Sequence, residues 1–151
     1  MTDLTNTKKQ QMVILLVEND RHRWTTIESW LPADTRTIWV GDVGAAFGIL
    51  RRSRAGYAGI MLDFNLDEYF NRDPTEMKNG ADVARVIVER MSHDIPVLVH
   101  SMSQAERWEA VKILQAAGFP VTQIPFVDLT KEKFLEWLEK ARECHTEMLT
   151  A

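Results

Sequence analysis

Cysteine is nearly absent from this chain. Cys144 is the only one, so no internal disulfide can form and the fold must be stable without one. Long apolar runs are also absent, because none comes near the roughly 20 residues that a membrane-spanning helix needs. The polar first residues lack the apolar segment of a secretory signal. We therefore expect a cytoplasmic protein that does not enter membranes.

An excess of basic charge is missing as well. The net charge is −4 at pH 7, whereas a nucleic-acid-binding domain normally carries a basic stripe. Arg51, Arg52 and Arg54 form one basic cluster, and their place at the end of a predicted helix explains them as charge that complements the helix dipole. We therefore expect no nucleic-acid partner.

The length of the chain suits one domain. It has 151 residues, of which 45% are hydrophobic and 26% are charged. A domain of this size buries about two-thirds of the surface that its unfolded chain exposes, so it needs no structural metal to fold. We expect a flexible N-terminal tail over residues 1–11, the domain over residues 12–146 and a C-terminal tail over residues 147–151.

Alternating strands and helices predict the fold class. Short apolar runs predict five strands, which are Met12 to Val17, Thr37 to Val40, Gly59 to Asp63, Ile95 to Val99 and Val121 to Ile124. Helical spacing predicts five helices, which are Arg21 to Leu31, Val43 to Arg54, Ala81 to Met91, Ser103 to Ala117 and Lys131 to Arg142. This alternation predicts a doubly wound, flavodoxin-like α/β fold, with a five-stranded parallel sheet between two layers of helices.

Capping residues support several of these helix ends. Asp42 is a good N-cap for the second helix, and Pro32 stops the first. The fourth helix opens with Ser103 and Glu106 in a capping-box pattern, and Gly118 stands at its C-terminal capping position.

Acidic residues follow two of the predicted strands. In doubly wound sheets the functional crevice lies at the carboxyl ends of the strands, where Glu18, Asp20 and Asp63 would converge. Carboxylates this close repel one another, and Mg²⁺ takes such oxygen ligands. The predicted Mg²⁺ site consists of Glu18, Asp20, Asp63 and the backbone carbonyl of Asn65. Asp63 is then a candidate nucleophile toward a phosphoryl group, while Asp20 alternatively only caps the next helix.

The fourth predicted strand ends in His100, Ser101, Met102 and Ser103. A hydroxyl at this edge can hydrogen-bond a phosphoryl group, and Ser101 is the candidate, because Ser103 is better explained as a helix cap. His100 is a candidate catalytic group, although a lone histidine is more often a hydrogen-bonded structural residue.

In combination these residues resemble the receiver domain of bacterial response regulators, the CheY-like superfamily, from about Met12 to Arg142. The matching positions are Glu18 and Asp20 for the acidic metal ligands, Asp63 for the phosphoacceptor, Ser101 for the hydroxyl and Ile124-Pro125-Phe126 for the Lys-Pro-Phe motif. The resemblance implies two-component phosphorelay signalling with Mg²⁺ as cofactor and a histidine kinase or other signalling protein as partner. It also implies a possible homodimer, and no enzymatic activity beyond phosphorylation and dephosphorylation of Asp63.

The chain departs from that family at several positions. Ile124 replaces the lysine that pairs with the phosphoryl group, and no nearby basic residue stands out in the sequence as its substitute. Asn19 stands where the second acid is usual, and Val121 occupies the position of the aromatic switch residue. The segment Asp67 to Asn79 is about nine residues longer than the matching receiver loop and is either a lid or partner site, or a tolerated surface insertion.

A second resemblance is narrower. Leu62 to Leu66, Gly80 and His100 to Ser103 are similar to a receiver-like family associated with cyclic-phosphate processing. Its pattern runs Leu-Asp-His-Asp-Leu, Gly and His-Ser-x-Asn, from which Phe64, Asn65 and Ser103 depart.

Three functional hypotheses follow, in descending order of preference. The first is a stand-alone receiver that is phosphorylated on Asp63. The second is a pseudo-receiver that acts through protein contacts without phosphorylation. For both hypotheses, the resemblance implies a partner surface with exposed parts of Lys131 to Arg142 and of the fourth helix, Ala105 to Gln115. Trp108 on that helix is a candidate anchor, although its helical spacing favours core packing. The third is a phosphoester-processing domain that uses Glu18, Asp63 and His100.

Overall fold

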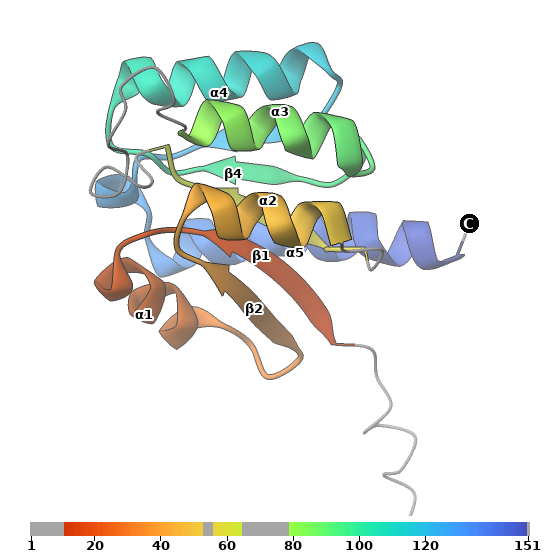
Figure 1. Cartoon of the computed structure of the whole chain (residues 1–151). Coiled ribbons are helices and arrows are strands. Elements are labelled where there is room, and N and C mark those ends of the chain that lie inside the picture. The colour runs from red at the N-terminus through yellow and green to blue at the C-terminus, as the bar shows by residue number, and fades with distance from the viewer. Residues whose placement is uncertain (1–10, 53–55, 65–78, 151) are drawn as a thin grey trace, which may run out of the picture.

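One parallel sheet organises the molecule. The computed structural model describes residues 11–52, 56–64 and 79–150, with side chains as far as 147. Five strands lie in the order β2-β1-β3-β4-β5, all parallel (Figure 1). They are β1 (Met12–Val17), β2 (Thr35–Val40), β3 (Gly59–Leu62), β4 (Val97–Val99) and β5 (Val121–Gln123).

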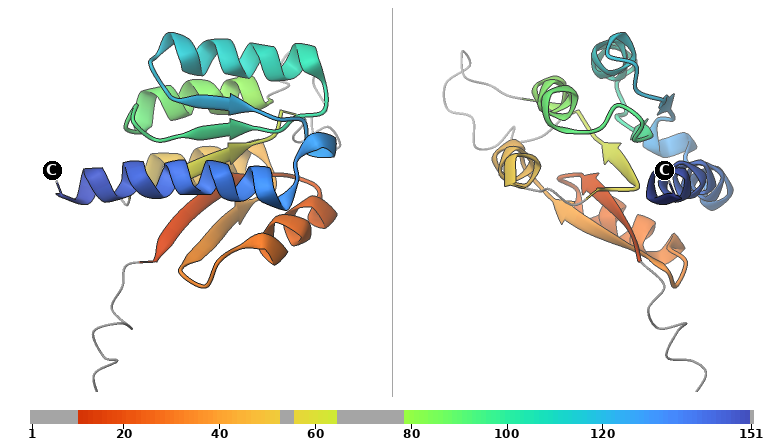
Figure 2. Two further views of the ribbon diagram at one scale, coloured as in Figure 1. Left: turned by 180° about the vertical axis from the view of Figure 1, so that it is seen from behind. Right: turned by 90° about the vertical axis from the view of Figure 1, so that its right-hand side faces the viewer.

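Helices cover both faces of the sheet. They are α1 (Arg21–Trp30), α2 (Val43–Arg52), α3 (Gly80–Arg90), α4 (Gln104–Ala116) and α5 (Lys131–Thr150), with a short 3₁₀ turn, η3 (Phe126–Asp128), before α5. The end-on view in Figure 2 separates α2, α3 and α4 on one face from α1 and α5 on the other. The predicted fold class and its three layers are therefore confirmed.

The strand β1 shows how one segment supplies both cores. Its side chains alternate between the two faces of the pleat. Leu15 and Val17 join the core beneath α2, α3 and α4, while Met12, Ile14 and Leu16 join the core beneath α1 and α5. A central strand buried on both faces explains why β1 reads as a continuous apolar run.

Several element bounds differ from the prediction. The fourth strand begins at Val97 rather than Ile95, because Pro96 has no amide to donate to the ladder. Helix α5 continues to Thr150 instead of ending at Arg142, so it passes through the boundary placed before the C-terminal tail over residues 147–151. The predicted end of the second helix at Arg54 lies outside the described residues.

Side-chain N-caps form at three helices: the predicted caps Asp42 and Ser103 are confirmed, and Asp20 forms the cap that was the alternative to its role as a metal ligand. The side chain of Asp20 accepts a hydrogen bond from the Arg23 amide, and that of Asp42 accepts one from the Ala45 amide. The side chain of Ser103 accepts one from the Glu106 amide, at the start of α4.

Trp108 lies on the surface of α4. It is 50% exposed, so the expectation that it fills the core is wrong.

Among the helices in the described part of the chain, none has both the length and the apolar character to span a bilayer.

Gly59 lets α5 approach the sheet closely. A Cβ at this position would lie 2.7 Å from Trp137 Cη2. Gly59→Ala should therefore destabilise the domain by about 1–3 kcal/mol, because the packed indole must move. Urea denaturation measures the loss. Gly56→Ala is the control, since a Cβ there meets nothing within 4 Å, and equal unfolding midpoints for both variants would contradict the packing argument.

An ion pair joins α5 to the loop before β2. The Arg142 guanidinium contacts both carboxylate oxygens of Asp34 at 2.5 and 3.2 Å, and this hydrogen bonding holds the pKa of Asp34 below its ordinary value. A lowered carboxyl pKa stabilises the fold above the unfolded-state pKa, and that contribution disappears as the pH falls through the folded-state pKa.

Asp34→Asn should therefore cost at most about 1 kcal/mol at neutral pH, because the carboxylate is partly exposed. The difference between the variant and the unmodified chain should shrink below about pH 4. Denaturant unfolding at several pH values measures it. A difference that stays constant down to pH 3, roughly one unit below the ordinary Asp pKa, would show that the ion pair is not its cause.

Candidate phosphoacceptor site

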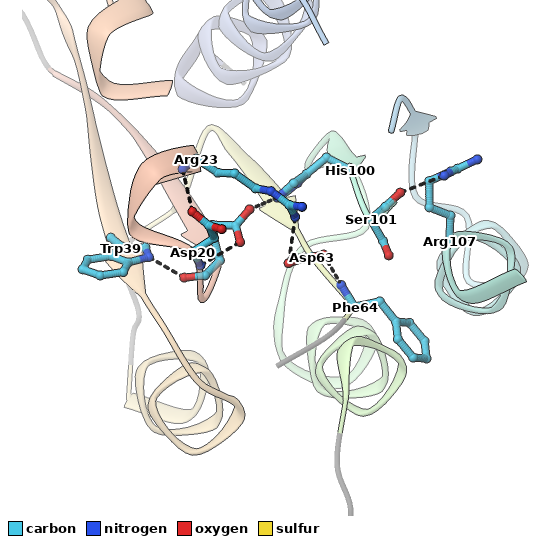
Figure 3. Close-up of polar contacts among 9 residues, drawn as sticks. Asp20, Arg23, Trp39, Asp63, Phe64, His100, Ser101 and Arg107 are labelled. Carbon is cyan, nitrogen blue, oxygen red and sulfur yellow. Dashed lines mark hydrogen bonds and ion pairs between the residues drawn. The ribbon is translucent and has the colours of Figure 1, made fainter. Parts of the chain in front are cut away.

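The central strands converge on one buried cluster at their carboxyl ends. Each strand places one polar residue directly after its last rung, and a ladder hydrogen bond fixes that residue. The Glu18 amide donates to Val40 O at 3.0 Å, the Asp63 amide to Val17 O at 3.0 Å and the His100 amide to Leu62 O at 3.1 Å. Figure 3 shows Asp63 and His100 pointing toward the same space.

Glu18, Asp63 and His100 form the cluster. All three are buried, and one ligand atom from each lies within 4.8 Å of the others. His100 Nε2 is hydrogen-bonded to Glu18 Oε1 at 2.9 Å, and the Asp20 amide donates to Glu18 Oε2 at 3.0 Å. The Phe64 amide donates to Asp63 Oδ1 at 2.8 Å. These bonds give Glu18 two partners and leave Asp63 the less compensated carboxyl group.

The pKa values of the two carboxyl groups move in opposite directions. Burial has the largest effect on the pKa of Asp63 and raises it. The neighbouring Glu18 carboxylate raises it further, the charge of His100 lowers it, and the pKa that results is about 7. Burial also acts to raise the pKa of Glu18, but hydrogen bonds from His100 and the Asp20 amide, with the charge of His100, outweigh it and lower that pKa. Glu18 is therefore the charged member of the pair, and Asp63 is easily protonated.

Ser101 follows His100 after the end of β4 and carries a buried hydroxyl. Its Oγ is buried and has no hydrogen-bond partner among the described residues. The backbone here is held by Arg107, whose Nη1 donates to the carbonyls of Ser101 at 2.8 Å and Met102 at 3.1 Å. Figure 3 shows this guanidinium on the far side of Ser101 from Asp63. The loop after β4 is thus fixed while the hydroxyl keeps its bonding capacity.

Of the predicted metal ligands, Asp20 does not join the cluster, and Asn65 lies outside the described residues. The Asp20 side chain is exposed and accepts from the Arg23 amide at 3.1 Å, so it caps α1. Most of the Asp67 to Asn79 segment also lies outside the described residues. The structure instead brings His100 to Glu18 and Asp63, so the donors that meet here are two carboxylates and an imidazole.

A basic residue that sequence reasoning missed lies at the mouth of the cluster. Arg23 Nη1 is 3.7 Å from Asp63 Oδ2, and the guanidinium lies 5.3 Å from the centre of the Phe126 ring. The sequence alone did not single out a basic residue as a substitute for the family's lysine, and the structure places Arg23 next to Asp63. The available signal was the Asp20 cap, because a helix that starts there returns its first turn to the end of β1.

A pair of tryptophans closes the side of the site next to β2. Trp24 and Trp39 stack with ring centroids 4.7 Å apart and planes 15° apart. The Trp39 indole N–H donates to the backbone carbonyl of Glu18 (Figure 3). The stack therefore fixes the backbone at Glu18 and the start of α1 together, a contact between distant segments that the sequence pattern does not reveal.

Gly80 brings the start of α3 against the Asp63 backbone. The Gly80 amide donates to Phe64 O at 2.8 Å, and a Cβ at Gly80 would lie only 2.5 Å from the Asp63 carbonyl oxygen and 2.6 Å from Phe64 Cα. Backbone atoms cannot turn aside as a flexible side chain can. The glycine is thus a requirement for placing α3 beside the candidate site.

Gly80→Ala should destabilise the domain by about 1–3 kcal/mol and shift the backbone amide resonances of Asp63 and Phe64. Denaturant unfolding and two-dimensional NMR measure the two effects. The matched control is Gly48→Ala in α2, where the nearest atom is the flexible end of Arg52 at 3.2 Å. That variant should be as stable as the unmodified chain or gain about 0.5–1 kcal/mol in free energy of unfolding, because alanine favours a helix interior more than glycine does. Unchanged Asp63 resonances in Gly80→Ala would contradict the steric argument.

Comparison with known proteins gives a fold but no sequence family. No family model matches the chain, and no curated protein matches it. The receiver domain of the sensor histidine kinase PA1611 from Pseudomonas aeruginosa PAO1, solved with a magnesium ion in its active site cleft, is 21% identical, with a TM-score of 0.65 over 86% of this chain and 96% of that chain. The non-phosphorylated HemR receiver domain from Leptospira biflexa is 25% identical, with a TM-score of 0.63 over 87% and 94%.

A CheY-like receiver domain protein from Methanospirillum hungatei JF-1 is 15% identical, with a TM-score of 0.63 over 91% of this chain and 99% of that chain. These matches agree with the observed strand order β2-β1-β3-β4-β5 and with helices on both faces of the sheet. The chain therefore has the CheY-like receiver fold, in a form whose sequence has diverged far from those of its structural neighbours.

Proposed function

We propose that this domain is a stand-alone receiver of a phosphorelay and accepts a phosphoryl group on Asp63. The observation that carries the proposal is the setting of that carboxyl group. Asp63 is buried at the carboxyl end of β3, with Arg23 Nη1 at 3.7 Å. Ser101 follows the end of the neighbouring strand β4, and its buried hydroxyl has no partner among the described residues. A nucleophilic oxygen, a hydroxyl donor and a cation at one strand edge suit a group that carries several negatively charged oxygens.

The donor set fits a divalent cation, and we propose Mg²⁺. Glu18 and Asp63 supply the oxygen ligands that this ion prefers, from adjacent strands. Burial together with the Glu18 charge disfavours a second charge on Asp63, as its raised pKa shows. A cation held there would neutralise both carboxylates and the oxygens of an incoming phosphoryl group. His100 keeps Glu18 oriented through the 2.9 Å hydrogen bond.

The proposed reaction uses an oxygen of ionised Asp63 as the nucleophile. This oxygen forms a bond to phosphorus, and the bond from phosphorus to the donor breaks, which is a phosphorus–nitrogen bond when the donor is a phosphohistidine. The electron pair of the broken bond leaves with the donor, which takes up a proton. Ser101 donates a hydrogen bond to a phosphoryl oxygen, while its backbone stays fixed by Arg107. We propose no reaction of this domain other than the gain and loss of the phosphoryl group on Asp63.

The proposed partner is a histidine kinase or another signalling protein, in the cytoplasm. One structural neighbour is itself the receiver domain of a sensor histidine kinase. The half-exposed Trp108 on α4 offers an anchor of the kind enriched at interfaces, either to that partner or to a second copy of the chain.

The other two hypotheses stand differently against the site. A phosphoester-processing domain would need His100 as an acid or base that reaches substrate, but its ring is fully buried and Nε2 is already paired with Glu18. That pairing argues against the third hypothesis. A pseudo-receiver would act through contacts of its surface and would not use the cluster. Phosphorylation of Asp63 therefore distinguishes it from a receiver.

Incubation with a small phosphodonor and Mg²⁺ should add one phosphoryl group, visible by intact mass. Asp63→Asn should abolish it, because the amide nitrogen that replaces a carboxylate oxygen is not a nucleophile here. Chelation of Mg²⁺ should suppress it too. Asp42→Asn is the matched control, since Asp42 is an exposed helix cap where asparagine serves equally well.

The control variant should be labelled like the unmodified chain. Labelling that survives Asp63→Asn would place the nucleophile elsewhere. If the unmodified chain takes up no label from either a small donor or a phosphorylated kinase, the receiver proposal fails and the pseudo-receiver hypothesis takes its place.

A further inference from the structure

The residue at the family's lysine position cannot contact a phosphoryl group on Asp63. Ile124 has no polar side-chain atom and packs against the core beneath α1 and α5. In the described part of the chain, Arg23 is the only lysine or arginine that forms an ion pair with Asp63. We propose that Arg23, at the start of α1, binds the phosphoryl oxygens in place of that lysine. This inference rests on the proposed function, because it assigns a residue to the same site.

The contact of Arg23 is directed at one oxygen of the carboxyl group. Asp63 Oδ1 accepts from the Phe64 amide at 2.8 Å, whereas Arg23 Nη1 faces Oδ2. Their separation of 3.7 Å exceeds the usual 2.7–3.2 Å range of an N–H···O hydrogen bond. The guanidinium is thus beside the carboxyl group without being locked to it, which agrees with the dominance of burial in raising the Asp63 pKa. No hydrogen bond joins its N–H donors to another described residue, so they can bind another set of oxygens.

One contact on the guanidinium and two supporting hydrogen bonds place Arg23 at this position. The Asp20 side chain accepts from the Arg23 amide at 3.1 Å and thereby fixes the first turn of α1. The Phe126 ring lies under the guanidinium, 5.3 Å from its centre, in the geometry of a cation–π contact. Phe126 is itself anchored, because its amide donates to His100 O at 3.0 Å. Figure 3 shows the Arg23 side chain extended across the mouth of the site between Asp20 and His100.

Arginine is well suited to bind phosphoryl oxygens at this position. Its planar guanidinium presents several N–H donors in a fork that matches phosphoryl oxygens, and it remains charged when partly buried. The Arg23 side chain is 26% exposed, so its charge is less screened than that of a surface residue. The chain thus carries a phosphoryl-binding cation on the element after β1, where a receiver carries it after β5.

The test is binding of beryllofluoride, a phosphoryl mimic, in the presence of Mg²⁺, followed by tryptophan fluorescence and NMR shifts. Arg23→Met should weaken binding by roughly 10- to 100-fold, the range for one lost charge-assisted hydrogen bond. Arg23→Lys should retain part of the affinity. Arg21→Met is the matched control, since it removes the same charge from an exposed position in the same helical turn, and should bind as the unmodified chain does.

Mg²⁺ titration without the mimic separates a binding role from mere damage to the site. Removal of a positive charge beside Asp63 should leave Mg²⁺ affinity unchanged or raise it, by Coulomb's law. Loss of both affinities in Arg23→Met would mean that Arg23 only supports the fold and would overturn the inference. Equal mimic affinity in Arg23→Met and the unmodified chain would overturn it too, yet leave the proposed function standing. Failure of the unmodified chain to bind the mimic would overturn both.

Discussion

A buried hydrogen bond between Glu18 and His100 underlies the organisation of the site. It crosses β3, because Glu18 follows β1 and His100 follows β4, and both side chains are fully buried. A carboxylate in such a place is costly unless it is paired, and removal of one member of a buried pair typically costs about 3–5 kcal/mol. The pairing therefore holds the ends of three central strands in one arrangement, with Asp63 between the partners.

That arrangement explains the unequal chemistry of the two carboxyl groups. Glu18 receives His100 and the Asp20 amide, so its charge is compensated. Asp63 receives the Phe64 amide and lies beside the Glu18 charge, and its pKa rises to about 7. Two acids at adjacent strand ends thus differ in role because their hydrogen-bond partners differ. A cation or a positively charged side chain is the natural way to favour the charged form of Asp63.

Helix α1 is the element that brings positive charge to the site. Asp20, which the sequence suggested as a metal ligand, caps this helix instead and so sets the position of Arg23. The Trp24–Trp39 stack ties the same helix to β2 and, through the Trp39 indole, to the Glu18 backbone. Polar and aromatic contacts are thus concentrated around β1 and α1.

The sequence by itself determined the doubly wound fold, the bounds of β1 and the caps at Asp42 and Ser103, because hydrophobic period and capping chemistry are local properties. It also indicated that Glu18, Asp20 and Asp63 would converge, since parallel strands end at one edge, whereas the structure brings His100 and not Asp20 to Glu18 and Asp63. Only the tertiary structure decided their partners. The pairing of Glu18 with His100 joins residues 82 positions apart. The approach of Arg23 to Asp63 depends on the angle at which α1 packs on the sheet, and no local pattern encodes that angle.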